Sequence, residues 1–199
     1  MPRDSDRYGR PEPGLSFPLP ALIARRPDMR FFWIVRHPLD AISSLRIGIA
    51  QNWGHHPRPT DWEGWLDRPL VAQCAHHWAF INSKGFAQVA DIAEVVTFED
   101  MIRDPLAFAR RIVAGLRLDD AETDAAVAAW ADRVQDSNNE RFVEAETSRG
   151  YSRPDHSRRV GRWRENLSAE DIALAWPIVA EPAEAFGYTR HGGGHRDGP

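Results

Sequence analysis

The sequence predicts an α/β domain of three layers, with helices on both faces of a parallel sheet. Two observations support this class. Phe31–Val35 (FFWIV) and residues 94–98 (EVVTF) are short runs of aromatic and β-branched residues, typical of strands buried on both faces. A helical pattern follows each run, so strands and helices alternate. Two strands are fewer than the about four to six of a common sheet, and we therefore expect the sheet to be incomplete.

Length and composition limit the number of domains and the classes of function. With 199 residues, 42% of them hydrophobic, the chain can bury one core, and we expect one domain over residues 1–190 and a disordered tail over 191–199. A net charge of −4 argues against nucleic-acid binding, and no apolar stretch approaches the ~20 residues of a membrane span. The single cysteine, Cys74, suits a reducing compartment, so we expect a cytoplasmic protein. An incomplete sheet would leave an edge open to homo-oligomer formation.

The first half of the chain divides at its prolines and glycines. Residues 1–16 are rich in both and read as a loop, and residues 17–25 have helical spacing. After the first strand, Pro38 and Asp40 are start signals for a helix that continues to about residue 50. Residues 51–65 mix aromatics, histidines and prolines, which indicates a long excursion outside the sheet.

The second half is mostly helical. Apolar residues at steps of three and four predict a long amphipathic helix over residues 67–90. After the second strand, Asp104 and Pro105 mark the start of a helix, and Ser168 with Asp171 forms a capping box for the last one, which Pro177 should kink or shorten. Two further segments are an alanine-rich helix over residues 121–134 and a mobile polar segment over residues 135–161.

The corner after the first strand is the clearest candidate for a ligand site. Arg36 stands at the carboxyl end of the strand, where open α/β sheets bind their ligands, and Ser44 lies on the second turn of the following helix. A guanidinium and a hydroxyl at this place suit an anion. The alternative is that Arg36 pairs with Asp40 or another neighbouring carboxylate.

Three segments in order resemble the sulfotransferases that use 3′-phosphoadenosine-5′-phosphosulfate (PAPS). These segments are WIVRHPLDAISS, VVTFEDMIRDPLAFARRIVAGLRL and HSRRVGRWRENLSAEDI. The resemblance implies a P-loop NTPase-like fold and transfer of a sulfuryl group from PAPS, as co-substrate, to a hydroxyl or amine of a small molecule, glycan or lipid. It also implies a pocket in which Arg36 and Ser44 bind the 3′-phosphate of the nucleotide.

The same resemblance assigns further nucleotide contacts. The late basic segment, which in the family closes over the nucleotide, contributes Gly161 and one or two of three arginines, Arg158, Arg159 and Arg162. Phe98 occupies the position of the family's usual tyrosine, so it can pack near adenine but cannot donate a hydrogen bond from a hydroxyl. The alternative for the arginine run is a solvated loop.

One part of the family's site is absent from the sequence. The family holds the 5′-phosphosulfate in a glycine- and serine/threonine-containing P-loop, and no G-x-x-x-x-G-K-[ST] or Ser-Gly-Thr run occurs here. We therefore expect a sulfotransferase truncated at its N-terminus, an inactive fragment as it stands. The alternative is a non-catalytic nucleotide-binding or interaction module derived from such an enzyme.

The catalytic base is predicted only by position. The family often places it 20 to 25 residues before the 3′-phosphate arginine, beside a basic residue, which indicates Glu12 as base and Arg10 as the nearby cation. The alternatives are a flexible tail at these positions and a base, or acceptor-pocket role, for His55 or His56. We expect no metal, because the histidine pairs lack a carboxylate or thiolate at ligand spacing. Four tryptophans have two alternative roles, as the wall of an acceptor pocket or as part of the core: Trp53, Trp62, Trp65 and Trp78.

Overall fold

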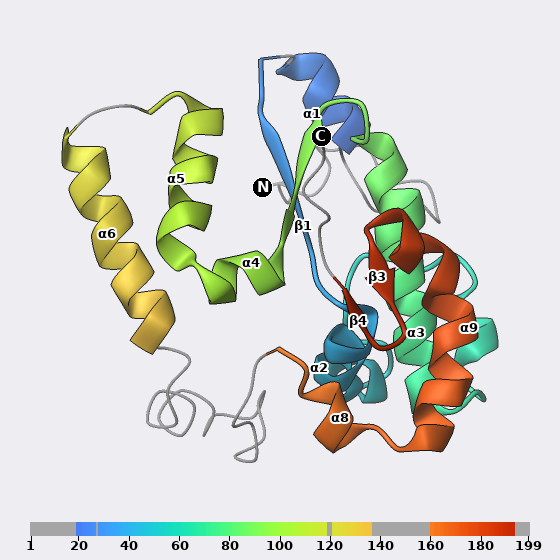
Figure 1. Ribbon diagram of the computed structural model, residues 1–199. Helices are drawn as coiled ribbons and strands as arrows, with labels where there is room; N and C mark the ends of the chain where they lie inside the picture. Colours follow the sequence, from blue (N-terminus) through green and yellow to red (C-terminus); the bar gives the residue numbers. More distant parts are fainter. Residues whose placement is uncertain (1–18, 27, 119–120, 137–159, 194–199) are drawn as a thin grey trace, which may run out of the picture.

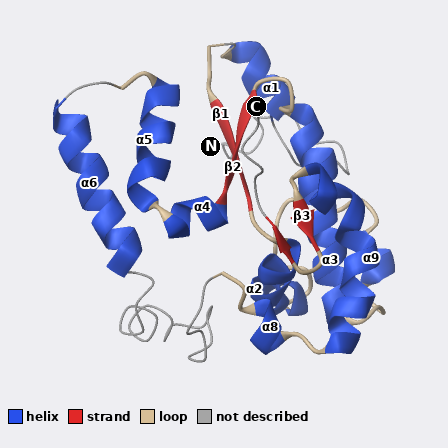
Figure 2. Ribbon diagram, in the orientation of Figure 1, coloured by secondary structure: helices blue, strands red, loops and turns tan. Residues whose placement is uncertain are grey.

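A computed structural model describes residues 19–26, 28–118, 121–136 and 160–193 of the protein (Figure 1). Most of these residues are helical, and the strands are few and short (Figure 2). The main elements, in chain order, are α1 (Leu19–Arg25), β1 (Phe31–Val35), α2 (Pro38–Ala50), α3 (Leu70–Phe80), β2 (Ala93–Thr97), α4 (Phe98–Arg103), α5 (Pro105–Leu116), α6 (Ala121–Asp136), α8 (Trp163–Asn166), α9 (Ala169–Ala185), β3 (Tyr188–Thr189) and β4 (Gly192–Gly193).

The two predicted strands pair in parallel. Phe31 lies opposite Ala93, and the register continues to Val35 opposite Thr97. The second strand ends one residue before its predicted end because the Thr97 side chain accepts a hydrogen bond from the backbone N–H of Asp100 and caps α4. The prediction that β1 is buried on both faces was wrong: Ile34 is 53% exposed. Successive side chains point to opposite faces of a strand, and Val35 is the one residue of β1 that is fully buried.

The core lies on the side of the strands occupied by three helices. Leu39 and Ile42 of α2, Cys74 of α3, and Ala175 and Val179 of α9 are all fully buried. The helix α3 packs against both α2 and α9. In Figure 1, α5 and α6 lie on the opposite side of the strands from α3 and α9. Helices are therefore present on both sides of the two-stranded ladder.

The predicted helix over residues 67–90 is shorter than expected. It begins at Leu70 and ends at Phe80, and a π turn (Ile81–Gly85) and a 3₁₀ turn (Phe86–Gln88) replace its last part. The side chains of Asn82 and Ser83 donate to the carbonyls of Trp78 and Ala79, four residues earlier. Polar side chains that bond to the backbone in this way compete with a regular helix.

Three helix starts agree with their sequence signals. Pro38 occupies the first turn of α2, and the Asp104 side chain accepts from the N–H of Ala107, 2.9 Å away, at the start of α5. Ser168 and Asp171 form the expected capping box of α9. Pro177 does not shorten α9, which runs through it to Ala185.

The end of the described chain differs from the expected tail. Tyr188–Thr189 and Gly192–Gly193 pair as a short antiparallel hairpin, so residues 191–193 are ordered against the domain. Gly192 and Gly193 have φ values of +151° and +109°, a backbone conformation that other residues rarely adopt. Most of the segment predicted to be mobile and polar, together with residues 194–199 of the tail, lies outside the described residues.

Candidate anion-binding site

Two arginines converge on one serine at the end of β1. Nη1 of Arg36 donates to Oγ of Ser44 at 3.2 Å, and Nη2 of Arg162 donates to the same oxygen. Arg36 follows β1 directly, Ser44 lies on α2, and Arg162 immediately precedes α8, 118 residues away from Ser44 in the sequence. The guanidinium of Arg36 lies over the ring of Phe98, 4.4 Å from its centroid. The tertiary structure thus brings two positive charges to a single neutral oxygen.

This convergence has an electrostatic consequence. Two guanidinium groups that share one acceptor repel each other, and a small anion beside Ser44 would be attracted by both. Planar guanidinium groups bind phosphate and sulfate oxygens through paired, charge-assisted hydrogen bonds. Ser44 adds a hydroxyl, which here donates to the backbone carbonyl of Asp40 at 3.3 Å. The cluster of Arg36, Ser44 and Arg162, called the anion cluster below, is therefore suited to a phosphate or sulfate group.

Asp40 holds the third member of the cluster in place. Its carboxylate is 1% exposed and accepts two backbone hydrogen bonds, from the N–H of Gly161 at 2.7 Å and from the N–H of Trp163 at 3.0 Å. Arg162 lies between these two anchored residues. Gly161 has φ +80°, which favours glycine at this position. The first turn of α2 therefore fixes the segment that carries Arg162 beside Ser44.

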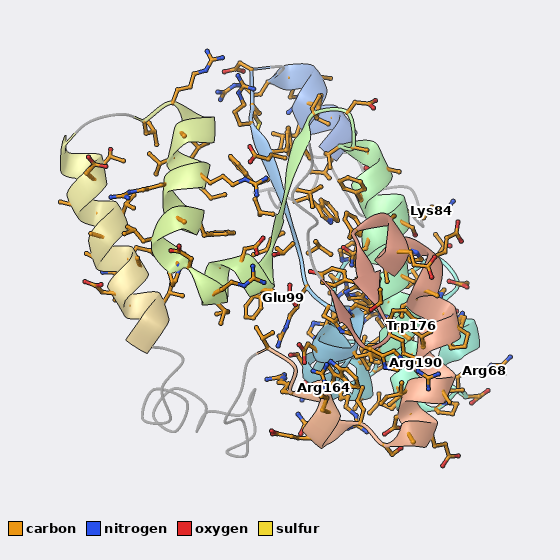
Figure 3. The ribbon with its side chains drawn as sticks, viewed as in Figure 1. Arg68, Lys84, Glu99, Arg164, Trp176 and Arg190 are labelled. Carbon is orange, nitrogen blue, oxygen red and sulfur yellow. The ribbon has the colours of Figure 1, made fainter. Side chains whose placement is uncertain are left out.

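A second buried network joins the strand end to the hairpin. Glu99 accepts from the backbone N–H of His37 at 2.9 Å and from the hydroxyl of Tyr188 at 2.7 Å. Burial, together with the nearby Glu99 carboxylate, raises the pKa of the Tyr188 phenol above its ordinary range. The Nε2 atom of His37 lies 3.0 Å from the carbonyl of Thr189, and burial lowers the pKa of this ring. In Figure 3, Glu99 lies at the start of α4, and Arg164 lies on α8.

A pocket of about 460 Å³ opens beside the anion cluster. It is lined by Arg36 and Ser44, by His56 and His77, and by apolar side chains that include Trp78. No aspartate or glutamate occurs among its described lining residues. A pocket with one guanidinium, two imidazoles and a hydroxyl favours an anionic ligand over a cationic one.

The histidines of the excursion pack against α3. Nε1 of Trp53 donates to Nδ1 of His77 at 3.1 Å, and burial lowers the pKa of His77 to about 4. The rings of His55 and His77 lie 5.8 Å apart, whereas His56 is exposed and borders the pocket. Trp53 is fully buried and Trp78 is 4% exposed. Of the four tryptophans considered for an acceptor pocket, Trp53 therefore belongs to the core, and Trp78 belongs to the core with one face on the pocket.

The predicted site residues fall into two groups. Arg36, Ser44 and Phe98 come together as described, and Gly161 lies next to the cluster through its bond to Asp40. The other four predicted site residues, Glu12, Arg10, Arg158 and Arg159, lie outside the described residues. Sequence reasoning missed the tethering role of Asp40. Its only signal was a carboxylate in the first turn of a helix, which is common for other reasons.

In the described part of the chain, histidines, cysteines and carboxylates form no group of three or more that could hold a metal ion. None of its helices has both the length and the apolar character needed to cross a bilayer.

Together, a parallel strand pair and helices on both sides define an α/β protein, and two arginines and a serine gather at the carboxyl end of β1, where open α/β sheets commonly bind their ligands. Comparison with family models narrows this class. Residues 1–125 match the model described as Sulfotransferase family, and the chain belongs to that family. The match includes Arg36, Ser44 and Phe98, whereas Gly161 and Arg162 lie beyond it. Searches of curated proteins and of solved structures gave no significant match.

Proposed function

We propose that the anion cluster binds the 3′-phosphate of PAPS and that the chain takes part in sulfuryl transfer to a hydroxyl or amine acceptor. The observation that carries this proposal is the convergence of Arg36 and Arg162 on Oγ of Ser44. Family membership supports transfer of a sulfuryl group in general. The chemistry of the cluster supports a dianionic phosphate as the group bound there.

The adjoining pocket supports the same assignment. It has room for a small ligand, since small-molecule sites commonly measure about 300–1,000 Å³, and Arg36 and Ser44 line its wall. Phe98, next to Arg36, offers an apolar surface on which adenine could pack. An arrangement with the phosphate at the cluster and the remainder of the nucleotide along the pocket uses Arg36 and Ser44, which belong to both.

Calorimetry with two nucleotides tests the proposal. Adenosine 3′,5′-bisphosphate carries the 3′-phosphate, and adenosine 5′-monophosphate does not, so we expect the first to bind at least tenfold more tightly, as one charge-assisted hydrogen bond of about 1.5–3 kcal/mol requires. Arg36→Ala should remove most of this difference, and Ser44→Ala part of it. Arg110→Ala, which changes an exposed arginine on α5, serves as the matched control. Equal affinities of the two nucleotides for the unaltered protein would exclude the cluster as a 3′-phosphate site.

Catalysis requires a site for the 5′-phosphosulfate as well as the proposed site for the 3′-phosphate. Transfer of a sulfuryl group resembles phosphoryl transfer, in which positioned cations and hydrogen-bond donors stabilise the charge that moves to the leaving oxygen. The sequence contains no P-loop run to hold the 5′-phosphosulfate, and this favours a second candidate function, nucleotide binding without turnover. Under this second candidate, the 199-residue chain binds adenosine 3′,5′-bisphosphate but leaves PAPS unconsumed. Release of that product from PAPS in the presence of acceptor alcohols would contradict the second candidate.

The assignment of the base remains part of the proposal. Glu12 would accept the proton of the acceptor hydroxyl, and Arg10 would stabilise the charge that develops on the leaving oxygen. If turnover is detected, Glu12→Gln should lower kcat by about 10²–10⁴-fold, the usual contribution of general acid–base catalysis. His56→Gln tests the alternative base at the pocket. Loss of kcat in the His56 variant alone would transfer the role to the histidine.

A further inference from the structure

One histidine in the wall of the pocket beside the anion cluster has a fixed hydrogen-bonding role. Nε1 of Trp53 lies 3.1 Å from Nδ1 of His77. An indole N–H can only donate, so Nδ1 is the acceptor, and in the neutral ring the proton lies on Nε2. The tautomer of a histidine is set by the bond that its other nitrogen makes, and Trp53 thereby turns Nε2 of His77 into a hydrogen-bond donor.

This donor has no acceptor in the described part of the chain. His77 is 5% exposed and lines the pocket together with Arg36 and Ser44. Its Nε2 atom makes no hydrogen bond to a described residue, and it is not one of the fully enclosed polar atoms found there. Polar groups in buried positions are normally paired, so an N–H that is accessible from a pocket and unpaired indicates a contact with a ligand.

The ring of His77 stays neutral at pH 7. Burial lowers its pKa to about 4, and the neighbouring imidazoles of His55, His76 and His56 act in the same direction. A neutral ring with its proton on Nε2 cannot accept a further hydrogen bond at that atom. His77 is therefore suited to bind an acceptor atom of a ligand and not to remove a proton from one.

The other polar side chains of this pocket leave room for an acidic group next to His77. Arg36 and Ser44 belong to the anion cluster, and both ends of the Asn82 amide are bonded within the protein. The remaining polar side chain, that of His56, is exposed, and no carboxylate occurs among the described lining residues. Hydrogen bonds to charged acceptors are about twice as strong as those to neutral ones, which favours a phosphate oxygen as the partner of His77.

We propose that Nε2–H of His77 binds the 5′-phosphate of the nucleotide whose 3′-phosphate lies at the anion cluster. This inference rests on the proposed function, because it takes the position of the 3′-phosphate from it. No P-loop run in the sequence provides donors for a 5′-phosphate, and His77 supplies one from the pocket wall. His77 thus determines specificity for nucleotides that carry both phosphates over those that carry the 3′-phosphate alone.

Calorimetry of the full chain with three nucleotides tests the assignment. Adenosine 3′,5′-bisphosphate carries both phosphates, and adenosine 3′-monophosphate and adenosine 5′-monophosphate carry one each. We expect the bisphosphate to bind at least tenfold more tightly than the 3′-monophosphate, as one hydrogen bond to a charged group provides. Equal binding of these two, with weaker binding of the 5′-monophosphate, would overturn this inference and leave the proposed function intact. Equal binding of the bisphosphate and the 5′-monophosphate, or no binding, would overturn both.

Two substitutions of His77 separate its donor from its role in the core. The amide of His77→Asn lies near the position of Nδ1 and can accept from Trp53, but it places no group at the position of Nε2. The amide of His77→Gln reaches that position and can donate there. We expect His77→Asn to reduce the preference for the bisphosphate over the 3′-monophosphate to about twofold or less, and His77→Gln to retain more of it. His76→Asn is the matched control, since His76 bonds to Asp61 and does not line the pocket.

NMR of ¹⁵N-labelled histidine side chains tests the unaltered protein directly. We expect His77 to appear as a neutral ring with its proton on Nε2, and the bisphosphate to shift the Nε2 signal more than the 3′-monophosphate does. The signals are assigned by their loss in His77→Gln. The inference is overturned if the proton lies on Nδ1, if the two nucleotides shift the Nε2 signal equally, or if His77→Asn binds them as His76→Asn does.

Discussion

Removal of the Asp40 carboxylate tests how the anion cluster is built. Asp40→Ala leaves the N–H groups of Gly161 and Trp163 without their acceptor. Hydrogen bonds to charged groups contribute about 1.5–3 kcal/mol each, and the partial exposure of Gly161 reduces the loss, so we expect the free energy of unfolding to fall by about 3 kcal/mol. With a urea dependence of about 2 kcal/mol per M, the midpoint should drop by about 1.5 M.

The same variant gives opposite predictions for ligand binding under two explanations. If Asp40 acted only through its charge, its removal near the cluster would strengthen the binding of adenosine 3′,5′-bisphosphate. If it acts by holding Arg162 beside Ser44, binding should weaken, and we expect a loss of about tenfold. Asp40→Asn removes the charge but keeps one acceptor oxygen, so its affinity for adenosine 3′,5′-bisphosphate should lie between those of the unaltered protein and Asp40→Ala. Asp132→Ala, at an exposed position on α6, is the control. Tighter binding by Asp40→Ala, or a midpoint equal to that of the control, would refute the tethering role.

Three further predictions follow from buried groups. Tyr188→Phe should lower the free energy of unfolding by about 1.5–3 kcal/mol because the phenol donates to buried Glu99. The folded state holds the phenol proton more tightly than the unfolded chain, so the stability of the unaltered protein should decline as the pH rises above the ordinary tyrosine pKa near 10. Urea unfolding between pH 8 and pH 11 measures both effects. Burial lowers the pKa of His77 to about 4, so as the pH falls the unfolded chain is protonated at this residue before the folded protein is. About 3 kcal/mol of the stability present above pH 6.5 should therefore be lost as the pH falls towards 4. In urea titrations His77→Gln should flatten this dependence of stability on pH, and an unchanged dependence would contradict the assignment. Burial raises the pKa of the Cys74 thiol to about 12, so we expect this thiol to react with a thiol reagent at pH 8 only after denaturation. Rapid reaction of the native protein would contradict this expectation and show that α3 opens readily.

Local signals in the sequence determined the elements around the site. These signals affect only the backbone a few residues away, so their effect can be predicted without knowledge of the fold. They are the apolar run of β1, the proline at the start of α2 and the capping residues Asp104 and Ser168. The spacing of Arg36 and Ser44 is likewise local, because both lie on one strand–helix unit. The same segments predicted the sulfotransferase family, which the family match confirmed.

Only the tertiary structure decided what these residues contact. The resemblance offered Arg162 as one of three candidate arginines, and the structure brings it to Ser44 across 118 residues of sequence. Asp40 tethers Gly161 across 121 residues, a contact that no local pattern specifies. Burial is also a property of the whole fold. Ile34 is a residue type common in cores but is exposed, whereas His37 is enclosed by side chains from α8, α9 and the hairpin. The sequence alone determined which groups stand at the carboxyl end of β1. Long-range packing determined that two arginines share one hydroxyl there, because charged side chains are brought together only when buried apolar surfaces fix the elements that carry them.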